Sequence, residues 1–203
     1  MVKRKVCLVG EQGVGKTSLI RRFTLGTFSG EYLRTLGAAV SKKPVVVPGE
    51  PEATRVDLVI LDIMGARTFM QLFRDAYFSG AAGVLAVFDL TRKASLEELP
   101  AWIRGVRQTV GTIPVVAIGN KTDLPDRVTV GDADVEAVLA PFGVQAVRTS
   151  ARTGENVEQA FLSLARAVLT PSYGQRVRQS EHVDGDPVDA PPFQVRDHPP
   201  PER

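Results

Sequence analysis

The stretch GEQGVGKTS, residues 10–18, constrains the fold more than any other part of this sequence. It fits the pattern G-x-x-x-x-G-K-[ST], follows an apolar run over residues 3–9 and precedes a helical pattern over residues 16–25. In such a strand–loop–helix unit, glycines let the backbone curl so that successive N–H groups point at phosphate oxygens. We therefore predict a phosphate-binding loop whose contacts come from Gly13, Val14, Gly15, Lys16, Thr17 and Ser18.

Two side chains of this loop carry its chemistry. Lys16 is expected to neutralise the β- and γ-phosphates of a nucleotide, and the Thr17 hydroxyl is a natural ligand for Mg²⁺. A glycine-rich turn without a ligand is the alternative, but the position between a strand and a helix makes the motif specific. Phosphate binding alone does not separate a kinase, an ATPase and a GTPase.

The base is indicated by GNKTD, residues 119–123, which follows a predicted strand over residues 114–119. Ligands bind where parallel strands end at their carboxyl side. Asp123 can accept hydrogen bonds from the ring N–H and the exocyclic amine of guanine, whereas adenine leaves the carboxylate unpaired, at a cost of roughly 1–3 kcal/mol. Asn120 can serve the other edge of the base and the Lys121 stem can lie along its plane. A plain turn is the alternative, and an ATPase or small-molecule kinase would require it.

A second loop strengthens the guanine interpretation. The stretch RTSAR, residues 148–152, comes after another strand-like run, at 144–149. Its Ser150 and Ala151 could offer backbone N–H groups to the guanine carbonyl.

The remaining pattern predicts an α/β protein. A strand is expected at 83–89, and helices at 67–79, 93–110, 132–141 and 154–169. Residues 38–47 and 54–63 are two strand-like runs joined by PGEPEA, which is typical of a hairpin loop. The prediction is a three-layer P-loop NTPase fold with a six-stranded, mostly parallel sheet, one antiparallel edge strand and about five helices.

Composition limits the function classes. The net charge of +2 does not favour a nucleic-acid partner, and both histidines, His182 and His198, fall near the C-terminus. The predicted domain therefore lacks the histidine that Ser–His or Cys–His nucleophiles and most zinc sites need. The single cysteine, Cys7, lies in an apolar strand and is expected to be a core residue, as is Trp102.

Domain organisation follows from a change in composition after Thr170. We expect one domain over residues 1–170 and a proline-rich, disordered tail over residues 171–203, which is either inert or a partner-binding arm. No apolar run is long enough for a membrane span, residue 2 is valine, and no cysteine lies near the C-terminus. These features predict a cytoplasmic monomer without a lipid anchor.

The motifs together resemble those of Ras-superfamily small GTPases. The phosphate loop, Thr35 in YLRTLGAAV, DIMG at 62–65, NKTD and TSA stand in that family's order and spacing. The stretches FDLTRKASLEELPAWI and GKTSLIRRF are most similar to the Rab branch, and the resemblance covers about residues 3–169. It implies a GTP/GDP switch whose effectors, exchange factors and GTPase-activating proteins contact residues 29–40 and 64–78.

The resemblance also assigns roles to individual residues. Thr17, Thr35 and Asp62 would hold Mg²⁺, with Asp62 acting through water. The Gly65 N–H would meet the γ-phosphate, and Phe28 would pack against guanine. The implied contacts with the nucleotide are completed by Tyr32 and Arg152.

One position departs from the family pattern. Where its members usually carry D-x-x-G-Q, this chain has Ala66, whose side chain cannot orient the attacking water. A second departure is Gln12, where the family commonly carries a small Gly, Ser or Ala. A bulky side chain there would crowd the γ-phosphate and any arginine finger from a partner. Three alternatives follow. A partner supplies the water positioning and charge that hydrolysis needs, or another residue of this chain substitutes for the missing side chain. In the third, hydrolysis does not occur and the protein is a GTP-bound scaffold. The catalytic candidates, including possible substitutes, are Lys16, Thr35, Gly65, Gln12, Arg34, Arg67 and Gln71.

The second switch also carries an apolar cluster. Part of it is expected to be core and part a face that an effector recognises in one nucleotide state. Its members are Met64, Phe69, Phe73, Tyr77 and Phe78.

Overall fold

The computed structural model describes residues 2–30, 38–49, 52–63 and 75–170. Within these ranges the chain forms a six-stranded sheet with the strand order β2-β3-β1-β4-β5-β6. The strands are β1 (Val2–Val9), β2 (Ala38–Val47), β3 (Thr54–Ile63), β4 (Gly83–Asp89), β5 (Val115–Asn120) and β6 (Ala146–Thr149). Only β2 and β3 pair antiparallel in this sheet, and β2 lies at its edge. The predicted fold class and hairpin are therefore confirmed.

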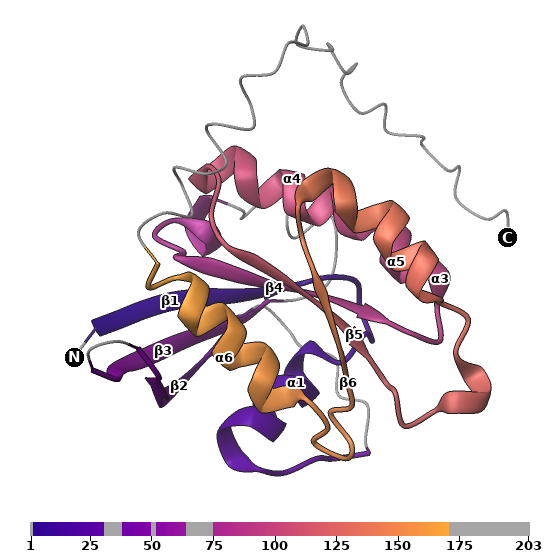
Figure 1. Cartoon of the computed structure of the whole chain (residues 1–203), viewed down its shortest axis with the longest axis horizontal. Helices are drawn as coiled ribbons and strands as arrows, with labels where there is room; N and C mark the ends of the chain where they lie inside the picture. The colour runs from indigo at the N-terminus through magenta and orange to yellow at the C-terminus, as the bar shows by residue number, and fades with distance from the viewer. Residues whose placement is uncertain (1, 31–37, 50–51, 64–74, 171–203) are drawn as a thin grey trace, which may run out of the picture.

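Helices cover both faces of the sheet (Figure 1). One face carries α1 (Lys16–Leu25) and α6 (Val157–Ala167), and the other carries α3 (Lys93–Glu97), α4 (Leu99–Val110) and α5 (Asp132–Leu139). Two short 3₁₀ helices follow β5 and α5: η1 (Pro125–Arg127) and η2 (Ala140–Phe142). None of the helices in the described part of the chain has both the length and the apolarity needed to cross a membrane.

The core follows from the two-residue period of the strands. In β1, Val6 and Leu8 belong to the apolar cluster under α1 and α6, whereas Cys7 and Val9 belong to the cluster under α4. Cys7 is buried, which raises the pKa of its thiol to about 12, and Trp102 is also buried. Both are core residues, as their sequence context predicts.

Two helices differ from their predicted bounds. The pattern over residues 93–110 predicts one helix, but α3 ends at Glu97 and α4 begins at Leu99. Pro100 lies in the first turn of α4, where it has no N–H to continue the α3 hydrogen bonds and favours a new helix start. The helix predicted from residue 154 begins at Val157, because Gly154 and Asn156 have positive φ and belong to the preceding loop.

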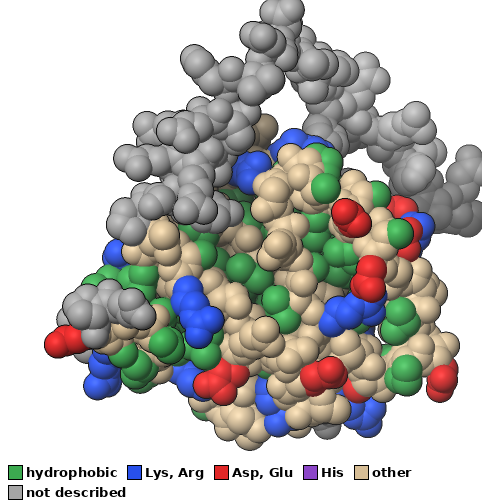
Figure 2. Space-filling view, in the orientation of Figure 1, with side chains coloured by type: hydrophobic (Ala, Val, Ile, Leu, Met, Phe, Trp, Pro, Cys, Tyr) green, Lys and Arg blue, Asp and Glu red, His purple; other side chains and the backbone are tan. Residues whose placement is uncertain are grey.

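The predicted helix at 67–79 falls largely outside the described residues. Residues 75–78 are helical, Phe78 is fully buried and Tyr77 packs against the same cluster. The other members of the apolar cluster predicted here lie outside the described residues: Met64, Phe69 and Phe73. On the face drawn in Figure 2, side chains of both charge signs are interspersed.

Strand β1 is the point where the strand order reverses, since β3 pairs on one side of it and β4 on the other. Ligands of open α/β sheets bind outside the carboxyl ends of the strands at such a point. The phosphate-loop motif begins at Gly10, directly after β1, and the NKTD motif begins at Asn120, the last residue of β5. The fold thus brings both motifs to the same edge of the sheet.

Candidate functional site

The loop between β1 and α1 approaches the neighbouring strands so closely that only glycine fits. A Cβ on Gly10 would lie 2.1 Å from the Val87 carbonyl oxygen of β4, and one on Gly15 would lie 2.2 Å from the Asn120 side chain. Both residues also have positive φ. No side chain caps the N-terminus of α1, and its first turn carries no acidic residue. The positive end of the α1 dipole is therefore not neutralised by an acidic residue of its own first turn, which favours an anion there.

Lys16 is the cation of this loop. Its ammonium group donates to the backbone carbonyls of Gly10 (2.8 Å) and Glu11 (2.9 Å), and the residue is only 7% exposed. Burial lowers the pKa of Lys16 to about 8, although the charges of Asp62 and Glu11 partly oppose that shift. A buried cation held by neutral carbonyls is suited to a phosphate group, which supplies the missing negative charge.

Two oxygen-bearing side chains near the phosphate loop are suited as ligands for Mg²⁺. The Thr17 hydroxyl of α1 donates to the buried Asp62 carboxylate of β3 at 2.5 Å. Among the described ranges, no group of three or more His, Cys, Asp or Glu side chains could hold a metal ion. One hydroxyl and one carboxylate fit Mg²⁺, which takes few protein ligands and completes its shell with water and phosphate oxygens. Thr35, the third expected ligand, lies outside the described residues.

The Asn120 side chain connects the phosphate loop to the loop after β6. Its Nδ2 donates to the Val14 carbonyl (2.9 Å), and its Oδ1 accepts from the Ala151 N–H (3.1 Å) and the Thr149 hydroxyl (3.3 Å). The sequence suggests contact of Asn120 with the base. In the structure this buried amide ties three segments of the site together, a role that the motif does not reveal.

Asp123 is held in place by Ser150. The Ser150 hydroxyl donates to Asp123 Oδ1 at 2.6 Å and accepts the N–H groups of Arg152 (3.1 Å) and Thr153 (3.0 Å). The second carboxylate oxygen, Oδ2, lies 3.9 Å from the Arg152 guanidinium. The orientation of the carboxylate is therefore set by the protein before a ligand arrives.

The backbone N–H groups of Ser150 and Ala151 differ from the expectation. The Ser150 N–H donates to the Glu155 carbonyl (3.1 Å) and the Ala151 N–H donates to Asn120 Oδ1. The tight turn after β6 satisfies its own donors, because buried backbone groups are paired in folded proteins. A guanine carbonyl can use these two donors only by sharing or replacing the present bonds.

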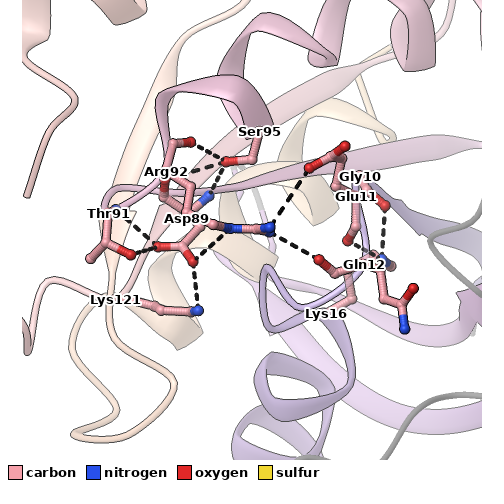
Figure 3. A network of polar contacts seen from close by, with 9 residues as sticks. All are labelled: Gly10, Glu11, Gln12, Lys16, Asp89, Thr91, Arg92, Ser95 and Lys121. Atoms are coloured by element: carbon pink, nitrogen blue, oxygen red, sulfur yellow. Dashed lines mark hydrogen bonds and ion pairs between the residues drawn. The ribbon is translucent and has the colours of Figure 1, made fainter.

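Lys121 belongs to a network that sequence reasoning missed (Figure 3). Its φ is 77°, unusual for a residue with a side chain, and its ammonium group lies 2.5 Å from Asp89 Oδ2. Burial raises the pKa of Asp89, but hydrogen bonds from Lys121 and Thr91 outweigh that effect and hold it below the ordinary value. Asp89 ends β4 at the same edge of the sheet as Asn120 ends β5, and that position was the available signal.

The other candidates are placed unevenly. The Gln12 carbonyl accepts a hydrogen bond from Arg92 at 2.9 Å, Ser18 lies partly buried in the first turn of α1, and Phe28 is 38% exposed. Six of the expected functional residues lie outside the described residues: Tyr32, Thr35, Arg34, Gly65, Arg67 and Gln71. Ala66, at the departure from the family pattern, lies there too.

Comparison with known proteins agrees with this geometry. The sequence model of the Ras family matches residues 5–170. The chain is 33% identical to the Ras-related protein Rab-37 of Homo sapiens over 196 residues, which cover 96% of this chain and 80% of that protein. It is 31% identical to Rab-13 of Canis lupus familiaris over 182 residues (89% and 87%) and 31% identical to human Rab-8B over 167 residues (82% and 78%). The chain therefore belongs to the Ras family and is a Rab-like small GTPase.

Proposed function

We propose that this small GTP-binding protein is a switch that holds GTP or GDP together with Mg²⁺ and hydrolyses GTP slowly. The observation that carries the proposal is the pairing of Asp123 with Ser150 at the same sheet edge as the phosphate loop. Asp123 supplies two acceptors for the adjacent donors of guanine, and Lys16 supplies charge for the phosphates. The Asn120 amide, bonded to both loops, sets their separation.

The proposed division of labour uses this chain's own residues. The phosphate loop and the N-terminus of α1 orient the phosphates, while Thr17 and Asp62 would hold the metal. Mg²⁺, when bound, neutralises charge that develops on the phosphate oxygens during transfer. Lys16 adds a buried positive charge whose effect is large because water is excluded from it.

Hydrolysis is the slow step because of Ala66. A methyl group cannot accept or donate a hydrogen bond, so the chain lacks a side chain at this position that orients the attacking water. Either a partner completes the site or a residue of this chain substitutes. Gln12 is one candidate, although its side chain points away from Arg92 in Figure 3 and its carbonyl is engaged by that residue. The other candidates are Arg34, Arg67 and Gln71.

Ala66 also favours a second candidate function. A chain that cannot orient water could stay loaded with GTP and act as an interaction scaffold for partners that recognise residues 29–40 and 64–78. The two functions share the nucleotide site and differ only in turnover. We propose the slow GTPase first, because Lys16, Thr17 and Asp62 keep the donor set that phosphoryl transfer requires.

Two experiments test the proposal. In a competition assay, unlabelled GDP and GTP should displace a bound fluorescent GDP analogue from the protein. Equal concentrations of ADP or ATP should displace none of it. Displacement by adenine nucleotides would contradict the role of Asp123. Single-turnover assays on Arg34→Ala, Arg67→Ala and Gln12→Gly then identify an internal substitute as the variant that abolishes hydrolysis while still binding GTP. If all three variants behave as wild type, the missing function is not supplied by these residues.

A further inference from the structure

Asp89 collects contacts from three residues at the sheet edge (Figure 3). Its buried carboxylate receives Lys121 Nζ at 2.5 Å and Arg92 Nε at 3.4 Å on Oδ2. On Oδ1 it accepts the N–H (2.9 Å) and the hydroxyl (2.7 Å) of Thr91. Lys121 belongs to the loop after β5, so one carboxylate joins that loop to the turn between β4 and α3.

Arg92 extends this network to the phosphate loop. Besides Nε on Asp89, its NH2 donates to the Gln12 carbonyl (2.9 Å) and its NH1 lies 3.9 Å from Glu11 Oε2. Each of the three guanidinium nitrogens thus faces a different acceptor. The backbone of the turn is fixed as well, because the buried Ser95 hydroxyl accepts the Asp89 N–H (2.9 Å) and donates to the Arg92 carbonyl (2.7 Å).

The contact with Gln12 has a consequence for the phosphate loop. In a trans peptide the C=O and the following N–H point in opposite directions. Because the Gln12 carbonyl is drawn toward Arg92, the Gly13 N–H points away from Arg92, in a loop whose N–H groups are proposed to bind phosphate. Rotation of this peptide would break the bond to Arg92.

From this geometry we propose that Arg92 is a positioning residue that clasps the phosphate loop to the Asp89–Lys121 pair and thereby slows nucleotide release. The proposal rests on the proposed function, guanine-nucleotide binding at this edge of the sheet. Arg92 reaches the phosphate loop through a bond to a backbone carbonyl, which substitution of Gln12 would leave intact. It touches neither the expected base contacts of Asp123 nor the expected metal ligands.

The clasp is of moderate strength. The Arg92 side chain is 44% exposed, so the ion pair with Glu11 contributes little, and most of the effect comes from the charge-assisted bonds to Asp89 and the Gln12 carbonyl. Loss of one such bond corresponds to roughly a tenfold change in rate. Lysine keeps the positive charge but has no planar fork that serves three acceptors at once.

The test measures release of a fluorescent GDP from the full chain in the presence of Mg²⁺ and excess unlabelled GDP. We expect Arg92→Ala to raise the dissociation rate about tenfold and Arg92→Lys to recover less than half of the loss on a logarithmic scale. The matched control is Lys93→Ala: the neighbouring cation pairs with Asp134 of α5 at 2.6 Å and does not reach the phosphate loop. Its rate should stay within about twofold of wild type.

The possible outcomes separate the two proposals. A wild type that holds no GDP refutes the proposed function. A wild type that holds GDP, with Arg92→Ala releasing it no faster than Lys93→Ala, overturns the clasp alone. Full recovery in Arg92→Lys would overturn the clasp by the guanidinium fork, because charge alone would then suffice. Thermal unfolding at saturating GDP is the control for structure, and Arg92→Ala should match Lys93→Ala there to within a few degrees.

A double-variant comparison tests the link through Asp89. If Asp89 and Arg92 act as one unit, Asp89→Asn combined with Arg92→Ala should raise the rate by less than the product of the two single effects. Effects that multiply would show that the two residues act separately and would overturn the clasp. Should Asp89→Asn fail to fold, the comparison of Arg92→Ala, Arg92→Lys and Lys93→Ala still decides the proposal.

Discussion

Replacing Gly15 by alanine is the perturbation whose effect the structure specifies best. Gly15 has a φ of +103°, and a Cβ there would lie 2.2 Å from Asn120 Nδ2, about 1 Å inside the closest normal contact. The Asn120 amide must move away, and it cannot do so without loosening its three hydrogen bonds of 2.9, 3.1 and 3.3 Å. The damage therefore reaches the loop after β6 as well as the phosphate loop.

The magnitude follows from these three bonds. At about 0.5–1.5 kcal/mol each, these bonds hold the site together with roughly 2–4 kcal/mol. Because GDP must restore that arrangement on binding to the variant, its affinity is expected to fall by about 30- to 1000-fold. The backbone strain of alanine at positive φ adds about 1 kcal/mol to the cost of folding. We expect the loss in GDP binding free energy to exceed the loss in the free energy of unfolding, because the displaced amide joins the two loops of the site.

A matched control isolates the steric part of this effect. Gly26, which ends α1, also has positive φ (69°), but a Cβ there meets nothing within 4 Å. Gly26→Ala should thus carry the backbone strain and leave the affinity for GDP within about twofold of wild type. Calorimetric titration with GDP and urea unfolding measure the two quantities. Equal losses of GDP affinity in Gly15→Ala and Gly26→Ala would refute the reasoning.

Three further predictions concern specificity, pH and the core. Asp123→Asn should weaken binding of GDP by about 100-fold or more, since two charge-assisted bonds are lost, whereas Asp126→Asn on the exposed η1 should have no effect in the same competition assay. Lys16, with a pKa near 8, is charged below that pH in the folded and unfolded chains alike. Its burial then costs stability, by about 3 kcal/mol, and the cost is relieved between pH 8 and about 10.5. GDP affinity should fall by up to tenfold per pH unit above pH 8, because phosphate needs the charged form, and a flat titration from pH 7 to 9 would exclude this role. Phe161→Ala should lower the free energy of unfolding by about 3–5 kcal/mol, since the buried ring stacks on Phe23 at 3.9 Å. A loss below about 1 kcal/mol in urea unfolding with GDP would show that this pair is not central to the core.

The parts of the fold that the sequence predicts are those with a strong local signal. The apolar runs that become β1 and β5 adjoin the phosphate-loop and NKTD motifs, and the loop PGEPEA joins two runs that pair as an antiparallel hairpin. The prediction of a single helix over residues 93–110 was wrong. The apolar periodicity continues past Glu98, but Pro100 has no N–H to continue the helical hydrogen bonds. An apolar pattern records which face is buried and is insensitive to such a break.

The same contrast between local sequence signals and contacts set by the fold applies to the site. The resemblance implies that Thr17 and Asp62 share a metal ion, and in the structure the Thr17 hydroxyl donates to the Asp62 carboxylate. The bonds of Asn120 to the Val14 carbonyl and the Ala151 N–H were not predicted. Contacts that depend on the fold alone escaped prediction. Arg92 lies in a turn without a motif, so nothing in the sequence indicates that its guanidinium reaches the Gln12 carbonyl, 80 residues away.

The engagement of the Ser150 and Ala151 N–H groups within the protein escaped prediction for the same reason. It depends on the path of the turn between β6 and α6, where Gly154 and Asn156 take positive φ. A sequence motif names the residues of such a turn and does not reveal which of their donors the turn itself uses.

The most direct test of the slow GTPase is single-turnover hydrolysis of GTP bound before the reaction starts, in wild type and in Ala66→Gln. We expect wild type to convert its GTP measurably in the presence of Mg²⁺. Ala66→Gln should do so at least about tenfold faster, because a side chain that orients the attacking water contributes that much or more. Equal rates in the two proteins would show that Ala66 does not limit turnover. A wild type whose GTP stays intact while Ala66→Gln hydrolyses it would contradict the slow GTPase and support the GTP-bound scaffold.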